Sequence, residues 1–352
     1  MLLSGPKATA RRLREGLHKK PSLPRFVFLV HALTPAHKRI LGARFSDPEL
    51  MAGGKGWGVP GRLCRIVVEG LAIGEVISLP LLPEELLTDQ EGALGRMEDG
   101  IRRAEGPVAA VGLGSVLAVV AGRGEALAER VNVPITTGAA ATTWAALGNT
   151  LRVHERIGGP IAVLGASGTV GDALVEALRG LGHEVIAGGT GKALERRCRS
   201  LGAKLLPEEE AASSARIVVG AATTGGTLAP EHLQPHSVLI DVALPPTLKR
   251  GVLPAGVVIL AGEAVDLPRG WTRGLWGQLY HLFAGYGPQQ IFACLAEPMV
   301  MAIQGRTTPF ALGRRLKPGA LAEFTEAARA LGLTPRLARG WREARLDELP
   351  KR

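Results

Sequence analysis

A glycine-rich turn between a strand and a helix is the feature that most constrains this 352-residue chain. Ile161–Leu164 is an apolar run of strand type, and Gly165, Gly168 and Gly171 follow at steps of three residues. An amphipathic helix pattern comes next, with its apolar residues on one face: Leu174, Leu178 and Leu181. Such a turn lets backbone N–H groups approach a pyrophosphate, and the helix N-terminus adds the positive end of its dipole. We therefore expect a dinucleotide-binding unit, which makes a redox enzyme the leading hypothesis.

Strands and helices alternate along the chain on both sides of this turn. The apolar runs of strand type lie at 26–33, 62–70, 72–82, 107–120, 131–138, 183–191, 215–224, 236–246 and 257–265. A long helix is predicted over 139–156, because its pattern is stopped by glycines and a proline at 158–160. This alternation is typical of a mostly parallel, doubly wound sheet.

The end of the second strand of the glycine-turn unit distinguishes the two nicotinamide cofactors. An NAD site places an acidic residue there to bind the ribose 2′-hydroxyl, but 187–192 contains none. Thr190 and Lys192 can instead hold a 2′-phosphate, with Arg196 or Arg197 behind them, so we favour NADP (as NADPH) over NAD. The full set of predicted cofactor-binding residues is Gly165, Ser167, Gly168, Thr169, Val170, Thr190, Lys192 and Ala222.

These patterns together predict an α/β fold made of several parts. A basic N-terminal arm (1–24) precedes an N-terminal α/β substrate domain (25–157), whose last helix bridges to the next domain. A Rossmann-type NADP-binding domain with a doubly wound parallel sheet follows (158–267). A C-terminal helical segment (268–352) carries the cysteine considered below.

The net charge of the chain indicates which kinds of partner it can bind. Its formal net charge of +10 favours acidic partners, including an acidic carrier protein, and permits peripheral contact with anionic membrane. No basic stripe interleaved with aromatic residues is present, which argues against nucleic acid. No apolar run is long enough for a transmembrane span, and the basic start lacks the apolar core of a secretory signal.

The cysteines indicate the compartment. Cys64, Cys198 and Cys294 lie far apart without metal-ligand spacing, and their odd number argues against a disulfide framework. We expect a cytoplasmic protein with no bound metal.

Cys294 is the candidate nucleophile. It lies in a helical pattern over 289–304, with Pro298 four residues on. Proline cannot donate to the carbonyl of Cys294, so the helix should bend or restart at the cysteine. Irregular backbone beside a thiol suits covalent catalysis, although a cysteine among apolar neighbours is more often a buried small hydrophobe.

Several motifs resemble those of the long-chain acyl-[acyl-carrier-protein] reductases over about 25–336. The most specific is Gln290-Ile291-Phe292-Ala293-Cys294-Leu295-Ala296-Glu297, which is similar to the family's Phe-Ala-Cys-x-Ala-Glu helix. The other similar segments are His31 with His37, Gly112–Ser115, Thr136–Gly138, Gly165–Gly171, and Leu239–Asp241 followed by Pro245. The weaker matches are Phe310 with Gly313-Arg314, and 331–335.

The resemblance implies a reaction and its residues. Cys294 would take the acyl group from a long-chain acyl-carrier-protein or acyl-CoA thioester, and NADPH would reduce it to a fatty aldehyde. Backbone N–H groups at Gly114–Ser115, or His31, are candidate oxyanion donors, and Glu297 is placed with them near substrate. The implied partners are the acyl carrier protein or acyl-CoA, and an enzyme that consumes the aldehyde.

The sequence departs from this family where substrate and cofactor should meet. Ala139-Ala140-Ala141 stands where the family has a polar set with Asn and His, and Val242-Ala243 and Pro246 replace glycines and a lysine. These positions bear on acyl specificity and on activity. Two alternatives remain: another NADP-dependent dehydrogenase of shikimate type, to which 131–134 is faintly similar, and a non-catalytic dinucleotide-binding sensor.

Overall fold

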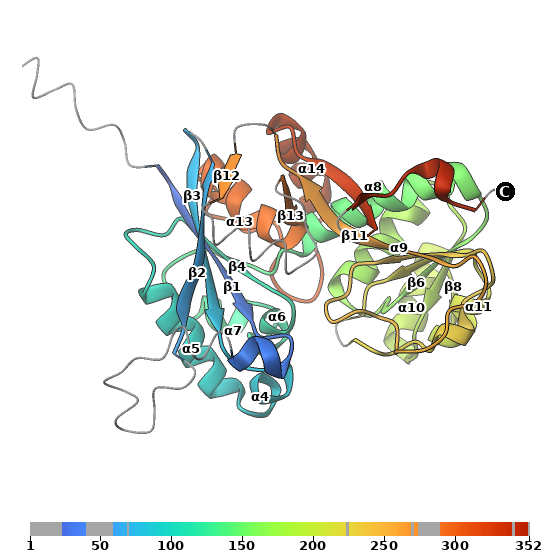
Figure 1. The fold of residues 1–352 in the computed structure, drawn as a ribbon, viewed down its shortest axis with the longest axis horizontal. Coiled ribbons are helices and arrows are strands. Elements are labelled where there is room, and N and C mark those ends of the chain that lie inside the picture. Colours follow the sequence, from blue (N-terminus) through green and yellow to red (C-terminus); the bar gives the residue numbers. More distant parts are fainter. Residues whose placement is uncertain are drawn as a thin grey trace, which may run out of the picture.

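The computed structural model describes residues 23–39, 59–68, 70–222, 225–268, 271–273, 289–339 and 342–350. The predicted basic arm, 1–24, lies outside this part except for its last two residues. The described strands form two sheets at opposite ends of the molecule, and a long helix runs from one to the other (Figure 1). That helix, α8 (Ala139–Ile157), matches the predicted bridge to within one residue.

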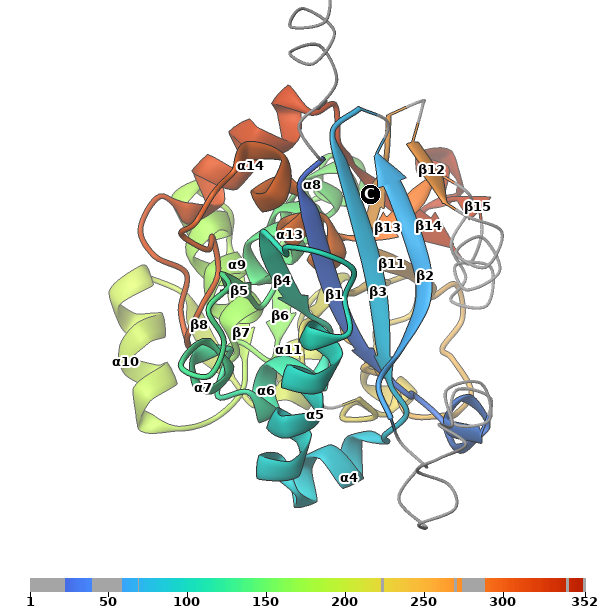
Figure 2. The same ribbon diagram turned by 90° about the vertical axis from the view of Figure 1, so that its left-hand side faces the viewer.

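The first sheet has the strand order β12-β2-β3-β1-β4-β5, which Figure 2 shows nearly face-on. The strand β1 is parallel to β3 and β4, β4 is parallel to β5, and β2 and β3 form an antiparallel pair. Its strands are β1 (Arg25–His31), β2 (Gly61–Val68), β3 (Ala72–Leu79), β4 (Ala110–Leu113), β5 (Ile135–Thr136) and β12 (Trp271–Arg273).

Helices cover both faces of the first sheet. The shorter helices, which follow β3 and β4, pack on one face, and Leu86, Met97, Leu117 and Leu127 supply their buried apolar side chains. The other face, with Phe26 and Phe28, packs on the start of α8 and on α13 (Ala293–Gln304). The shorter helices are α4 (Pro83–Thr88), α5 (Gln90–Arg102), α6 (Val116–Val120) and α7 (Glu125–Ala128).

The second sheet contains the predicted Rossmann-type parallel core. From β8 through β7, β6, β9 and β10 to β11 all neighbours are parallel, in the order 3-2-1-4-5-6 of a doubly wound fold. Its strands are β6 (Ile161–Leu164), β7 (Val185–Gly188), β8 (Lys204–Leu206), β9 (Ile217–Gly220), β10 (Val238–Asp241) and β11 (Val258–Asp266). The central strands are buried along their whole length, which explains why they are continuous apolar runs.

The helices of the second sheet also lie on both faces. One face packs on α8, α9 (Thr169–Gly180) and α10 (Lys192–Leu201). The other packs on α11 (Glu208–Ser213) and the short η1 (Pro230–His232). The predicted α/β fold class is therefore confirmed. No helix in the described ranges is long and apolar enough to cross a bilayer.

The C-terminal segment contains the predicted helices and, in addition, strands that were not predicted. The helices are α13 and α14 (Ala320–Ala330), with η2 (Leu346–Glu348) near the end. The strand β12 joins the first sheet, whereas β13 (Gln290–Phe292), β14 (Thr334–Arg339) and β15 (Arg342–Glu343) extend the second. β12, β13 and β15 have only two or three residues and carry almost no periodicity, and β14 contains a proline and two arginines instead of an apolar run, so the sequence alone does not reveal them.

Candidate active site

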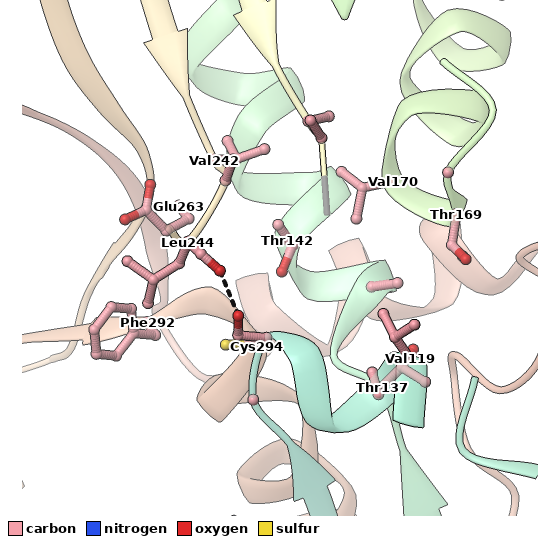
Figure 3. A pocket seen from close by; sticks show the side chains of 18 of the residues that line it. Val119, Thr137, Thr142, Thr169, Val170, Val242, Leu244, Glu263, Phe292 and Cys294 are labelled. Carbon is pink, nitrogen blue, oxygen red and sulfur yellow. Dashed lines mark hydrogen bonds between the residues drawn. The ribbon is translucent and has the colours of Figure 1, made fainter. Parts of the chain in front are cut away.

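A cavity of about 170 Å³ lies where the carboxyl ends of the parallel strands in the two sheets face each other (Figure 3). Its walls come from the ends of β1 and β4, the start of α8, the glycine turn before α9, the segments after β9 and β10, and the start of α13. Carboxyl ends of parallel strands are where open α/β sheets bind ligands. Figure 3 shows Cys294, Glu263 and Phe292 on one side of this space, and Thr169 and Val170 on the other.

The cavity brings together many, but not all, of the predicted site residues. Those that line it are His31, Ser115, Gly168, Thr169, Val170, Ala222 and Cys294. Those that do not line it are Gly165, Ser167, Thr190, Lys192 and Glu297. The thiol and the nucleotide turn, which are more than a hundred residues apart in sequence, thus share one space.

The glycine turn has the close packing that its sequence predicts. Gly165 has a φ of +70°, and a Cβ there would lie 2.7 Å from the Ala222 nitrogen. A Cβ on Gly171 would lie 2.3 Å from the Gly165 oxygen. Gly168 caps α9 without a side-chain hydrogen bond, so the first-turn N–H groups have no side-chain acceptor at the cap. This cradle fits an anion such as a pyrophosphate.

The proposed 2′-phosphate residues lie beyond β7, away from the cavity. Thr190, Lys192 and Arg196 are exposed there. Arg197 is not available for this role, because its guanidinium donates to Asp172 at 2.8 Å and to Glu176 at 2.7 Å. The expectation that Arg197 stands behind a 2′-phosphate is therefore corrected, since its charge is already compensated by two carboxylates.

Cys294 lies in the first turn of α13 and is half-buried. The strand β13 ends at Phe292 and the helix begins at Ala293, so the predicted irregularity is a strand-to-helix junction. Burial raises the pKa of the Cys294 thiol to about 12; Glu263 and Glu297 add to this effect, whereas nearby backbone N–H groups oppose it. The thiol is therefore neutral near pH 7 and needs a base to become a nucleophile.

Gly138 explains why a Thr-Thr-Gly segment stands beside the thiol. Gly138 has a φ of +73°, and a Cβ there would lie 2.5 Å from the Cβ of Cys294. Only glycine permits this approach with this backbone. Of the alanines that follow, Ala139 lines the cavity, whereas Ala140 and Ala141 are buried outside it.

His31 is a candidate base at this cavity. Its Nδ1 lies 2.9 Å from the Ala32 oxygen, and its buried Nε2 has no hydrogen-bond partner among the described residues. With Nδ1–H donating to that carbonyl, Nε2 carries the lone pair. Burial lowers the pKa of His31, with the Ala32 bond opposing it, so the ring is neutral near pH 7.

Glu263 is a cavity residue that sequence reasoning missed. It lies on β11, and its charge is the largest charge effect on the Cys294 thiol. The available signal was a carboxylate inside the otherwise apolar run over 257–265.

Ser115 connects the two halves of the cavity wall. Its hydroxyl donates to the carbonyl of Leu244, in the segment that follows β10. The Gly114 N–H already donates to Leu29 at 2.9 Å, so Ser115 is the remaining backbone candidate for an oxyanion donor at this turn. Ser115 has a φ of +50°, a backbone that a non-glycine residue adopts only when its surroundings enforce it.

Glu297 was predicted to lie near substrate, but its side chain is bound within the protein. Its side chain is fully buried and accepts hydrogen bonds from the Thr136 hydroxyl and, at 3.0 Å, from the Ala141 N–H. The carboxylate thereby caps the N-terminus of α8 from a separate helix. This geometry gives the substrate role of Glu297 no support.

Comparisons with known proteins give partial likenesses. No model of a known protein family matches the chain. It is 30% identical over 276 residues to the aminotransferase PigE of a Serratia species. The aligned region covers 74% of this chain and 32% of that protein. It is 31% identical over 161 residues to the long-chain acyl-[acyl-carrier-protein] reductase of Synechococcus elongatus. That aligned region covers 44% of this chain and 46% of the reductase. The matches therefore span about a third of the first relative's length and just under half of the second's.

Solved structures resemble the chain only distantly. Shikimate 5-dehydrogenase from Thermus thermophilus is 19% identical, with 88% of this chain and 100% of that chain covered and a TM-score of 0.37. L-Tryptophan dehydrogenase from Nostoc punctiforme is 15% identical, with 65% of each chain covered and a TM-score of 0.34. Values this low carry no argument about function.

Proposed function

We propose that this chain is an NADPH-dependent reductase that converts a long-chain acyl thioester to a fatty aldehyde through an acyl group held on Cys294. One observation carries the proposal: the thiol and the glycine turn of the Rossmann-type sheet line the same cavity. A nucleophile and a nucleotide turn that share one space are the parts that reduction of a covalently held acyl group requires.

The residues around the glycine turn fit a dinucleotide. Gly168 leaves the first turn of α9 without a side-chain cap, so the N–H groups at Thr169 and Val170 face the place of a pyrophosphate. Ala222, which packs against the turn and lines the cavity, has a small side chain that leaves room for a ribose and nicotinamide. Thr190 and Lys192 would hold the 2′-phosphate that distinguishes NADPH from NADH. NADPH, when bound, would supply the hydride that reduces the acyl group, and the bond from the acyl carbon to the Cys294 sulfur would break to release the aldehyde and return the thiolate.

Cys294 attacks the carbonyl carbon of the thioester, and the bond from that carbon to the carrier sulfur breaks. Because burial keeps the thiol protonated near pH 7, a base must first accept its proton. His31, which lines the cavity, is the proposed base, since its ring is neutral and its buried Nε2 has no hydrogen-bond partner among the described residues. The same proton can then pass to the departing carrier thiolate.

Negative charge that develops on the acyl oxygen needs hydrogen-bond donors. The Ser115 N–H is the proposed donor. The walls are mainly apolar, and a low-polarity surrounding would strengthen such a donor.

The substrate is proposed to be an acyl-carrier-protein or acyl-CoA thioester, and an aldehyde-consuming enzyme is the proposed downstream partner. The net charge of +10 supports an acidic carrier. The cavity lining in the described part of the chain contains no lysine. A catalytic lysine is what an aminotransferase that forms a Schiff base needs, and we expect one in a shikimate-type dehydrogenase as well, so we favour neither activity.

The test is incubation of the purified protein with a long-chain acyl-carrier-protein thioester and NADPH, with aldehyde measured by mass spectrometry. The Cys294→Ser variant should give no aldehyde, whereas Cys198→Ala, which alters a buried cysteine in α10, should behave like wild type. Aldehyde production by Cys294→Ser at the wild-type rate, or none by wild type with carrier and CoA thioesters alike, would sink the proposal.

A further inference from the structure

Two arginines outside the predicted site lie together beside the start of α9. Arg123 is the only arginine among the described residues that line the cavity. Its carbonyl accepts a hydrogen bond of 2.9 Å from Gly313, and the next residue, Arg314, accepts one of 3.1 Å at its carbonyl from the Thr169 hydroxyl. These bonds join both arginines to the helix that follows the nucleotide turn.

The backbone at Arg123 is unusual for its residue type. Gly122, Arg123 and Gly124 all have positive φ angles, of 60°, 63° and 88°. Glycine adopts such a conformation freely, but a residue with a Cβ does so at a cost. The Arg123 N–H donates to the Ala118 carbonyl at 2.7 Å, which holds this strained turn. Strain at a residue whose side chain lines a cavity points to a use for that side chain.

Neither guanidinium is neutralised by the described part of the chain. Among the described residues, no carboxylate lies within 4 Å of the Arg123 or Arg314 guanidinium, and neither guanidinium donates a side-chain hydrogen bond. The nearby carboxylate of Glu125 lies close to Gly313 instead. Asp172 already binds Arg197 and lies 3.8 Å from Arg315. Burial, and next the charge of Arg314, lower the pKa of Arg123. An anion between the two arginines would relieve this repulsion.

We propose that Arg123 and Arg314 bind a phosphate group beside the N-terminus of α9. Planar guanidinium groups bind phosphate through paired hydrogen bonds, and the uncapped first turn of α9 adds N–H donors of the same sign. The phosphate belongs either to the diphosphate of the dinucleotide or to the phosphopantetheine arm that carrier proteins and coenzyme A share. The second source rests on the proposed function; phosphate binding itself does not.

The experiment is calorimetric binding to the full chain with Cys294→Ala, which prevents turnover. The ligands are NADPH, decanoyl-phosphopantetheine thioester and decanoyl-pantetheine thioester, the last two differing by one phosphate. The variants are Arg123→Gln and Arg314→Gln, and Arg102→Gln is the control, because Arg102 is exposed and, among the described residues, pairs only with Asp99. Arg314 is exposed in a loop, so its variant tests the site even if Arg123→Gln fails to fold.

Loss of a charge-assisted hydrogen bond should weaken phosphate binding about tenfold to a hundredfold. A loss of that size for NADPH alone assigns the site to the dinucleotide. A loss for the phosphopantetheine thioester alone, which removes its advantage over the pantetheine thioester, assigns it to the arm. Unchanged affinities in both variants, or an equal loss for the phosphate-free thioester, would overturn the proposal. These readouts need no aldehyde, so they remain informative if the proposed reaction fails.

Discussion

Replacing Glu297 by glutamine should remove a pH dependence of stability that this buried carboxyl imposes on the whole fold. The side chain is fully buried, and the hydrogen bonds from Thr136 and Ala141 reach it from β5 and α8. Burial raises the pKa of Glu297 from 4.5 to about 7, although those hydrogen bonds favour the charged form. Glutamine has nearly the same shape and no charge to desolvate.

The size of the effect follows from this pKa. Because the folded protein holds the proton more tightly than the unfolded chain, protonation stabilises the fold below pH 4.5, and this stabilisation is lost as the pH rises through 7. Each pKa unit corresponds to about 1.4 kcal/mol. Between pH 5 and pH 8 the free energy of unfolding should therefore fall by about 2.5 kcal/mol because of this one group.

The assay is urea unfolding of wild type and Glu297→Gln at several pH values from 5 to 8. The variant should lack the decline, so that its stability relative to wild type improves as the pH rises. Glu326→Gln, which changes an exposed carboxylate on α14, should follow the wild-type profile. The reasoning would be refuted if the free energy of unfolding changed with pH equally in wild type and Glu297→Gln. It would also be refuted if the variant became less stable relative to wild type toward pH 8. The hydrogen-bond donors would then outweigh burial.

Three further predictions concern the cavity. Because the pKa of Cys294 is about 12, its alkylation by iodoacetamide, followed by mass spectrometry, should rise about tenfold per pH unit between pH 7 and 10; a plateau near pH 8 would contradict this. Gly138→Ala should lower the free energy of unfolding by about 2 kcal/mol or more, since its Cβ meets that of Cys294 at a positive φ; a melting temperature equal to wild type would show that the segment moves aside. Ser115→Ala should cost about 1 kcal/mol through loss of its bond to Leu244, measured by urea unfolding; an unchanged midpoint would mean that this bond contributes nothing.

The sequence predicts those parts of the fold that have long periodic patterns or glycine punctuation. The strand Ile161–Leu164 is placed to the residue and the helix α8 to within one residue, because an apolar run before glycines, and a helix stopped by Gly158, are local signals. The strand β13 was absorbed into the predicted helix over 289–304, because its three residues become a strand only by pairing with β11. Such a strand is decided by a tertiary contact that no local window contains.

The candidate site was predictable in its chemistry more than in its geometry. Cys294 and the glycine turn carry recognisable motifs, and they line one cavity. Glu297 lies one helical turn after the thiol and on the same side of α13, yet its carboxylate is occupied by the Ala141 N–H at the start of α8, a contact that the motif alone does not reveal. Glu263 and Arg123 belong to no motif, and only the approach of the two sheets brings them to the cavity.

The path of the C-terminal segment limits how this protein can be divided or recombined. The segment adds β12 to the first sheet, seats α13 against that sheet, and then adds β14 and β15 to the edge of the second. A break after the bridging helix would strip the first sheet of β12 and of its covering helix α13, which carries Cys294, and would remove from the second sheet the helix α8 that packs on one of its faces. The two sheets are therefore not exchangeable modules: gene fusion or domain shuffling can move the cavity and Cys294 only together with both sheets.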